Sequence, residues 1–463
     1  MGLTPLHLAG MGVTLAVIVL VGIHSGRHVQ NASDFAVGGG KESYLMVAGA
    51  LIGTLVGGSC TIGAAQGAYI AGLYGIWYMI GLMIGCLLAG FFYAVPIRKS
   101  GVLTLQELFS VRYGRTAGLV SSVLTVAGVL ISIVVQMLAA VSLLSTALGL
   151  PAWVSALTAA ALMLVYVTFG GMLGAGQVGI VKTLLLLSMT VYGIVYVPTH
   201  IAALPAALSS LPRETYFSLW AGNGLQANIA SALSAVVGLS SSQMYIQVVC
   251  AARSDKVARR SMLFGGLFLV PVGAAMLLIG LYMRLSAPDI AAAAALPTFL
   301  LTHMSAFPAG VMIAALLITV IGSGSGVALS ISTIITNDLY KRFARQADEK
   351  KELLVARLSL VAIFASGVVF ALTNLGSYML DWMFLSMALR SAVNFVPFVA
   401  VLFLRRRVTE RQIILTMFVG LGVYLVWMFT LGGTLDPIFP GLGSAFLCYF
   451  VCSKRAAHAP AEA

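Results

Sequence analysis

Charged residues are scarce in this chain of 463 residues, since only 9% are Asp, Glu, Lys or Arg. Soluble proteins average about 25%. Hydrophobic residues make up 60% of the chain. A composition this apolar excludes a soluble globular domain and indicates a protein of the lipid bilayer.

Motifs for several other chemistries are also missing. The six histidines stand in links, in the tail or at the ends of apolar runs, without the spacing of metal ligands. The five cysteines lie in or at the ends of apolar runs, which predicts small buried side chains rather than a disulfide framework. No phosphate-binding loop or nucleophilic triad is present, so gradient-driven transport is favoured over ATP-driven transport and no cofactor is expected. A membrane-embedded enzyme would need paired intramembrane acids or histidines, which the sequence lacks.

The chain instead contains a series of apolar runs of about 20 residues, the length that crosses a bilayer. Runs of this length must be helices, because no water is present at mid-bilayer to satisfy the backbone groups. The sequence therefore predicts an all-α integral membrane protein, with a single transmembrane domain over 1–463 and about thirteen transmembrane helices. The expected spans are 5–24, 43–70, 74–97, 118–148, 152–169, 174–198, 223–250, 260–284, 307–338, 352–373, 378–403, 411–430 and 436–452.

The net charge of +12 invites the idea of a nucleic-acid partner, but the basic residues sort by side of the membrane. With the N-terminus outside, alternate links and their flanks hold 22 of the 26 Lys and Arg residues. This distribution is the positive-inside bias. It predicts a multi-pass protein of the cell (inner or plasma) membrane with the N-terminus outside and the C-terminus in the cytoplasm, and no nucleic-acid partner.

Two of the expected spans are interrupted near their middle by small and polar residues. The first carries VGGSCTIG at 56–63, and the second carries Gly238 followed by three serines at 240–242. Close helix packing through small residues explains one such interruption. Two interruptions, in spans of opposite direction, are typical of an inverted-repeat transporter that binds its solute at unwound backbone.

Four stretches resemble the sodium:solute symporter family: SDFAVGGG at 33–40, GVLTLQELFSVRYG at 101–114, SSQMYIQVVCAARSDKVARR at 241–260 and STIITNDLYKRF at 332–343. The resemblance implies alternating access, usually coupled to sodium. It also implies two inverted five-helix repeats with broken first helices, at 43–198 and 223–403. One extra helix and its link precede them at 1–42, and two helices and a short tail follow at 404–463.

The family binds sodium through backbone carbonyls of the first broken helix and through a carbonyl and two adjacent hydroxyl residues of a later helix. The resemblance carries the carbonyls over to Gly53, Val56 and Thr319, and the hydroxyl pair to Gly322 and Ser323. Gly322 has no hydroxyl. A sodium ion is still possible at this site, but the site is expected to be degraded, because hard cations need oxygen ligands.

A second departure from the family lies in GGMLGAGQVGIVK at 170–182. Relatives carry an aspartate where this chain has Gly179 and a glutamine where it has Lys182. Some proton-coupled transporters of the same overall fold hold a lysine in the space of the sodium ion, and Lys182 resembles that arrangement. The alternative is that Lys182 extends along the helix to the inner interface.

Arg390 stands in the middle of the run 378–403, about twelve residues from either end. A charge at this depth costs several kcal/mol unless it meets a partner or a cavity, and such charges mark function by default. Asp381 is about 13 Å away along the helix, too far for a direct pair, and the sequence assigns it no role. Arg390 is therefore expected to contact either an anionic solute or the backbone carbonyls of another helix.

The expected solute site is small and polar, which favours a compact organic acid or amino acid. The identity of the solute, the coupled ion and the oligomeric state are left open, and the only partners expected are the solute and the lipid bilayer. A transporter-like solute sensor is a lesser alternative, because the tail after Cys452 is too short for a signalling domain. The residues expected to bind solute are Gly57, Gly58, Ser59, Cys60, Ser241, Ser242, Gln243, Tyr245 and Arg390.

Overall fold

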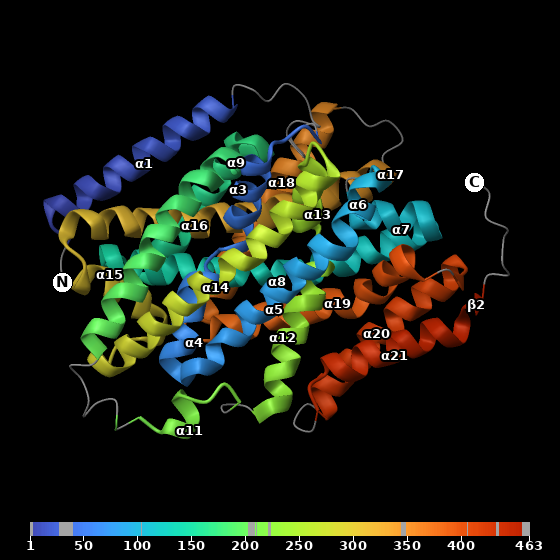
Figure 1. Cartoon of the computed structure of the whole chain (residues 1–463). Coiled ribbons are helices and arrows are strands. Elements are labelled where there is room, and N and C mark those ends of the chain that lie inside the picture. Colours follow the sequence, from blue (N-terminus) through green and yellow to red (C-terminus); the bar gives the residue numbers. More distant parts are fainter. Residues whose placement is uncertain are drawn as a thin grey trace.

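The computed structural model is helical almost throughout (Figure 1). It describes residues 3–26, 40–102, 104–201, 209, 211–220, 224–343, 349–404, 406–431 and 435–455. Side chains are described for these residues except at 22–26, 169–175, 343, 349 and 454–455. Residues 33–39 of the first family stretch and most of the C-terminal tail lie outside the described part.

The first half of the chain forms α1 (Pro5–Gly26), α3 (Tyr44–Leu55), η2 (Ser59–Gly63), α4 (Ala64–Ala71), η3 (Gly72–Ile76), α5 (Trp77–Leu88), η4 (Ala89–Tyr93), α6 (Ala94–Ser100), α7 (Leu105–Tyr113), α8 (Arg115–Leu148), α9 (Ala152–Ile201) and α11 (Arg213–Tyr216). The second half forms α12 (Gly224–Ser240), α13 (Gln243–Ala251), α14 (Asp255–Ser286), η5 (Ala292–Ala294), α15 (Ala295–His303), α16 (Ala306–Thr333), η6 (Ile334–Tyr340), α17 (Lys341–Phe343), α18 (Glu349–Thr373), α19 (Met379–Phe403), α20 (Glu410–Thr430) and α21 (Ile438–Cys452). Two short strands, β1 (Arg406–Arg407) and β2 (Lys454–Arg455), pair antiparallel.

The structure bears out the helical membrane architecture but not the exact count of thirteen spans. Within the described residues, eight helical segments are long and apolar enough to cross a membrane, and the bent pair α12 and α13 makes nine. Other expected spans correspond to shorter apolar helices, such as α1 and α21. Apolar length in a sequence does not distinguish these shorter helices from full spans.

The expected spans 152–169 and 174–198 belong to one element, α9, which has 50 residues. Tyr166 and Lys182 nevertheless approach the same point. A Cβ atom built on Gly322 lies 3.5 Å from the Tyr166 hydroxyl and 2.9 Å from the Lys182 Nζ atom. In a straight helix, two residues 16 positions apart would be separated by about 24 Å. The long side chains of Tyr166 and Lys182 therefore both extend from α9 toward Gly322.

Both expected interruptions are present as breaks in helical structure. The first lies at 56–58, between α3 and η2, where Val56 already has an extended backbone. The second lies at Ser241 and Ser242, where α12 and α13 meet at 49°. Gly238 is part of α12 and packs against Met387, so this break begins later than the sequence indicated.

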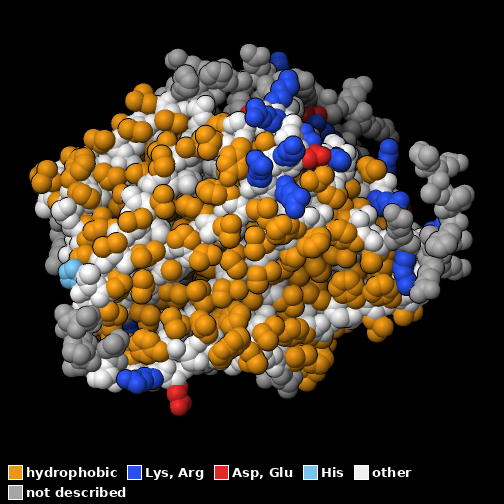
Figure 2. All heavy atoms as spheres, in the orientation of Figure 1, with side chains coloured by type: hydrophobic (Ala, Val, Ile, Leu, Met, Phe, Trp, Pro, Cys, Tyr) orange, Lys and Arg blue, Asp and Glu red, His pale blue; other side chains and the backbone are white. Residues whose placement is uncertain are grey.

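Basic side chains gather at one end of the molecule, which we call the basic end. It includes the end of α6 with Arg98 and Lys99, the link after α13 with Arg253, and α17 with Lys341 and Arg342. Figure 2 shows Lys and Arg side chains along the upper right of the molecule and a broad apolar surface below them. This apolar surface is the part of the molecule that suits contact with lipid.

The packing of the helices places the two breaks at the centre of the molecule. α3 packs against α9 and α14, while α12 packs against α5 and α19. α16 contacts α1, α8 and α9, and α19 packs along α8 (Figure 1). The segments around both breaks therefore meet α8, α16 and α19.

Candidate functional site

A cavity of about 30 Å³ lies between the two helix breaks, and it is large enough to hold water. α8, α16 and α19 complete its wall. It is lined by Thr54, Leu55, Ser59, Tyr78, Val129, Ser132, Gln136, Ser242, Gln243, Met244, Tyr245, Ser323, Val327, Ser330, Ile334, Met383, Met387 and Arg390. A cavity at paired breaks is where a transporter with inverted repeats holds its solute.

The structure brings five of the nine expected solute-binding residues to the cavity wall. These are Ser59 from the first break, Ser242, Gln243 and Tyr245 from the second, and Arg390 from α19. The Ser59 hydroxyl is within 3.2 Å of the Tyr78 hydroxyl, which also faces the cavity. The wall therefore offers several hydroxyl groups and one guanidinium group.

Gly57 and Gly58 do not line the cavity but allow neighbouring helices to approach the first break. A Cβ atom on Gly57 would come 2.7 Å from the Ser323 side chain. The backbone N–H of Gly58 donates a 3.0 Å hydrogen bond to Oε1 of Gln136. Gln136 thus satisfies a backbone group that the interruption of the helix leaves free.

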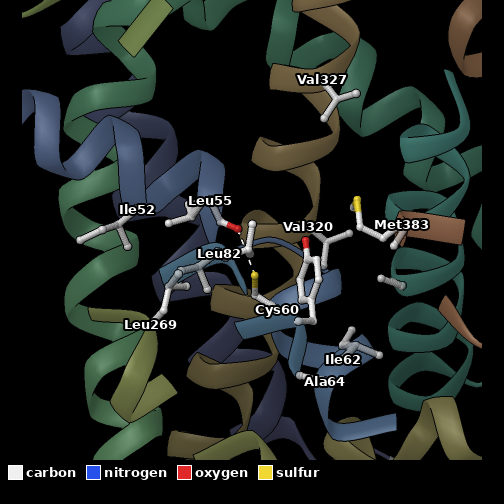
Figure 3. Close-up of a cluster of buried hydrophobic side chains, with 14 of the residues drawn as sticks. Ile52, Leu55, Cys60, Ile62, Ala64, Leu82, Leu269, Val320, Val327 and Met383 are labelled. Carbon is white, nitrogen blue, oxygen red and sulfur yellow. Dashed lines mark hydrogen bonds between the residues drawn. The ribbon is translucent and has the colours of Figure 1, made fainter. Parts of the chain in front are cut away.

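Cys60 and Ser241 also do not line the cavity. The Cys60 thiol donates to the carbonyl oxygen of Leu55 at 3.1 Å, and apolar side chains such as Leu82 and Val320 surround it (Figure 3). The Ser241 hydroxyl donates to the Val237 carbonyl oxygen at 2.9 Å. Neither residue lines the cavity, because polarity near a break does not tell which face of the helix a side chain occupies.

Arg390 is buried, with an exposed fraction of 4%, and it lines the cavity. Its Nη1 atom donates a long 3.5 Å hydrogen bond to the Ser242 hydroxyl, and its Nε atom has no hydrogen-bond partner. Among the described residues, none of the ion pairs involves Arg390. Asp381 stands in the first turn of α19 and is exposed, far from this guanidinium. A buried guanidinium with so few partners can accept an anionic ligand.

Several residues of the cavity wall were not anticipated from the sequence. Tyr78, Ser132 and Gln136 come from α5 and α8, which are unbroken where they pass the cavity. Ser132 also shares a 2.6 Å hydrogen bond with Ser386 of α19. The available signal was the isolated Gln136 in a long apolar helix, because a buried amide in a membrane requires a partner.

Gly53, Thr319 and Gly322 of the expected cation site lie around the Lys182 ammonium group. Lys182 is buried, and its Nζ atom donates to the carbonyl oxygen of Gly53 at 2.7 Å and to that of Thr319 at 3.4 Å. The Ser323 hydroxyl donates to the same Gly53 oxygen at 3.2 Å. Val56 is buried at the end of α3, and its backbone N–H bonds to Ile52. The alternative in which Lys182 reaches the interface does not hold.

A lysine ammonium group thus lies at the carbonyl oxygens expected to bind a sodium ion. The Lys182 ammonium occupies two of the carbonyl oxygens that an ion would need, and Gly322 supplies no hydroxyl. The absence of a side chain at Gly322 also leaves space, since a Cβ atom there would lie 2.9 Å from Nζ. The missing hydroxyl at Gly322 and the presence of Lys182 are thus linked, because the glycine leaves room for the ammonium group.

Polar contacts connect two helices at the end of the molecule opposite the basic end. Gln66 of α4 donates to the Ser377 carbonyl oxygen at 3.2 Å and accepts from the Met379 backbone N–H at 3.1 Å. Tyr378 lies against Gly67, where a Cβ atom would overlap its hydroxyl. These contacts join α4 to the start of α19.

At the basic end, the cavity wall is connected to the short helix α7. Oε1 of Gln243 accepts a 2.9 Å hydrogen bond from the backbone N–H of Leu105, the first residue of α7. Arg98 holds the link after α13 through Asp255 at 2.7 Å and the Ala252 carbonyl oxygen at 2.8 Å. A side chain of the cavity wall therefore also fastens the basic end.

Comparison with known proteins decides the family. The model of the sodium:solute symporter family matches residues 35–420. The chain belongs to the sodium:solute symporter family. It is a multi-pass membrane transporter of a small-molecule solute rather than an enzyme, and sodium is the coupling ion for which the family is named.

A relative in this family and two solved structures give the similarity in numbers. The chain is 24% identical to the uncharacterized symporter YwcA of Bacillus subtilis (strain 168), over 79% of this chain and 74% of the relative. A substrate-bound, outward-open structure of a sodium-coupled sialic acid symporter covers 98% of this chain and all of its own, with a TM-score of 0.79 and 18% identity. A closed structure of the nucleobase-cation symporter MHP1 covers 91% of this chain and 94% of its own, with a TM-score of 0.57 and 14% identity. At these identities, the two structures show the shared fold.

Proposed function

We propose that this symporter-family protein carries a small carboxylate across the cell membrane by alternating access, with the Lys182 ammonium in place of the coupling sodium ion. The observation that carries the proposal is the position of Lys182 Nζ, 2.7 Å from the Gly53 carbonyl oxygen. The proposed substrate-contacting residues are Ser59, Ser242, Gln243, Tyr245 and Arg390.

Arg390 supports an anionic solute. It is the one charged side chain in the cavity wall formed by the described residues, and that wall includes no carboxylate. A carboxylate solute would accept hydrogen bonds from the guanidinium in the bidentate geometry that Arg favours. The ammonium group of an amino acid would find no acidic partner in the wall, which favours an organic acid over an amino acid.

The Lys182 contacts support transport without sodium. An ammonium group that already satisfies Gly53 and Thr319 leaves a sodium ion no place among these oxygens. A lysine can release and rebind a proton, so proton coupling is the alternative that this site supports best. Family-typical sodium symport is the second candidate, and it would require Lys182 to leave the site.

The distribution of charge supports the proposed orientation. The basic end faces the cytoplasm under the positive-inside rule, which places the N-terminus outside and the C-terminus inside. The contacts of Gln66 with Ser377 and Met379 then close the outer side of the cavity.

Uptake by proteoliposomes tests the proposal. Purified protein is first screened by thermal shift against short organic acids and the matching amino acids, with and without sodium, because a ligand stabilises in proportion to its occupancy. Uptake of the stabilising solute is then measured under an imposed sodium gradient, an imposed proton gradient and no gradient. We expect uptake of an organic acid that does not need sodium. Strong sodium-driven uptake that Lys182→Gln leaves unchanged would overturn the role of Lys182.

A further inference from the structure

Two buried cations border the central cavity, and none of the described acids neutralises them. Arg390 lines the cavity, while Lys182 lies behind Ser323, which lines the cavity and shares the Gly53 carbonyl oxygen with Lys182. The described side chains that approach Arg390 or Lys182 are Ser242, Tyr78, Tyr245 and Tyr166, which are all neutral. With Lys182 protonated, the empty site therefore carries two positive charges.

Because of these two charges, the reorientation of the protein depends on whether a solute is bound. During alternating access the cavity must pass through a state that is closed on both sides. Enclosing cations away from water is unfavourable unless a counter-charge enters with them. A bound carboxylate supplies such a counter-charge next to Arg390, so the loaded protein reorients more easily than the empty one.

We infer that the protein exchanges one carboxylate for another across the membrane faster than it performs net transport. This inference rests on the proposed carboxylate function. In exchange, both reorientation steps occur with an anion in the cavity. In net transport, one step occurs with an empty cavity and two enclosed cations.

The two cations differ in whether they can lose their charge when the cavity is empty. The guanidinium of Arg390 keeps its proton under all physiological conditions. The ammonium of Lys182 can give its proton to water when the cavity is open, and the empty protein then encloses one cation fewer. The groups that face Lys182 from the packed helices are the carbonyl oxygens of Gly53 and Thr319 and the Tyr166 hydroxyl, so among the described residues no acid holds the proton in place. Net transport is therefore expected to speed up as pH rises, while exchange changes little.

The experiment compares two batches of proteoliposomes that contain the full-length protein. One batch is loaded with unlabelled pyruvate and the other with buffer alone, and both receive external [¹⁴C]pyruvate. Potassium with valinomycin holds the membrane potential at zero, so that charge movement does not limit net uptake. We expect preloading to raise the initial rate of labelled pyruvate uptake roughly tenfold at neutral pH. A change of this size requires only a small difference between the free-energy barriers for reorientation of the loaded and the empty protein. We expect this ratio to fall at alkaline pH.

The variant Lys182→Gln removes one of the two cations and should bring the rate of net uptake closer to that of exchange. Lys256→Gln is the matched control, because Lys256 is exposed at the basic end. The comparison within the wild-type protein stands even where Lys182→Gln fails to fold.

The possible failures are distinguishable. Equal rates of pyruvate uptake with and without internal pyruvate overturn the exchange inference and leave carboxylate transport intact. Absence of uptake in both batches, for pyruvate and equally for lactate and glycolate, overturns the proposed function and the exchange inference together.

Discussion

The Nζ atom of Lys182 lies 2.7 Å from the carbonyl oxygen of Gly53, just before the point where α3 ends. The ammonium thus bonds a broken helix on one side and the Thr319 carbonyl oxygen of α16 on the other. A sodium ion would have to make the same two contacts. Removing the lysine and restoring a hydroxyl at residue 322 should therefore allow sodium to bind in place of the ammonium group.

The double variant Lys182→Gln with Gly322→Ser is expected to make uptake dependent on sodium. It removes the resident cation and adds a hydroxyl beside Ser323. A single interaction with a charged group is worth about 1.5 to 3 kcal/mol, so the apparent sodium affinity should rise by about tenfold or more. Initial uptake as a function of sodium concentration measures the effect.

Gly322→Ser alone serves as the comparison for the double variant. Its Cβ atom would lie 2.9 Å from the Lys182 Nζ atom, so the ammonium must shift. We expect lower thermal stability and no gain in sodium dependence. The interpretation is wrong if the single and double variants respond to sodium alike.

Substitutions at Arg390 should separate solute binding from stability. Arg390→Lys keeps the charge but loses the planar fork, and we expect a carboxylate to bind less tightly by about 1 to 3 kcal/mol. Arg390→Gln should weaken binding further. Arg260→Gln, at an exposed position, is the control and should change neither property.

Melting temperature and ligand affinity are measured on the same preparations of the Arg390 variants. A structural clamp would lower the melting temperature without ligand and leave the affinity of the folded fraction unchanged. A neutral or cationic solute as the true substrate would also remove the basis for this prediction.

Gln243 is expected to hold the basic end closed through its hydrogen bond to Leu105. Gln243→Leu keeps the volume but loses this bond, which is worth about 0.5 to 1.5 kcal/mol, so opening should increase by about two- to tenfold. Cys250 reports on the opening, because its thiol bonds the Val102 carbonyl oxygen at 3.4 Å just before α7. Labelling by a water-soluble maleimide, located by mass spectrometry, gives the rate.

Gln247→Leu is the matched control on the same helix, since Gln247 lies 3.5 Å from the Ser330 hydroxyl on α16 rather than bonding α7. It should change labelling of Cys250 less than Gln243→Leu does. Equal labelling in the two variants would mean that the contact with Leu105 does not restrain opening.

Glu42, in the link before α3, gives a prediction about pH. Its backbone pairs with the link after α13, and partial burial raises the pKa of its carboxyl group above the usual value. The folded state then binds more protons than the unfolded state, so this group lowers stability as pH rises above about 4.3. Glu42→Gln should raise the melting temperature at pH 7 and have little effect near pH 4. A stabilisation that is equal at both pH values would contradict the assignment.

The sequence predicted the parts of the fold that depend on composition and local chemistry. Apolar length gave most of the spans, and the glycine and serine residues gave the positions of both breaks, at 56–58 and at Ser241. Two spans were expected at 152–169 and 174–198, where the structure has the single element α9, and the convergence of Tyr166 and Lys182 on Gly322 was not predicted. That convergence depends on how helices distant in sequence pack together.

The residues of the cavity wall also depend on how distant helices pack together, so the sequence predicted only part of them. Residues at the breaks were predicted from their polarity, but Cys60 and Ser241 face their own helices instead. Tyr78 and Ser132 line the cavity from helices whose local sequence shows no interruption there. Which face of a helix meets a cavity is set by tertiary packing, and a single sequence gives little information on it.

The short distance between Gly322 and Lys182 constrains how such a protein can arise in evolution. Starting from an ancestor that bound sodium, a lysine gained before the glycine would be crowded by the Cβ atom of residue 322, which would lie 2.9 Å from the ammonium. A glycine gained first would weaken the ion site before any replacement was present. In either order the first change alone leaves an incomplete site, so the two changes depend on each other, and no single mutation at residue 182 or 322 restores both parts of the sodium site.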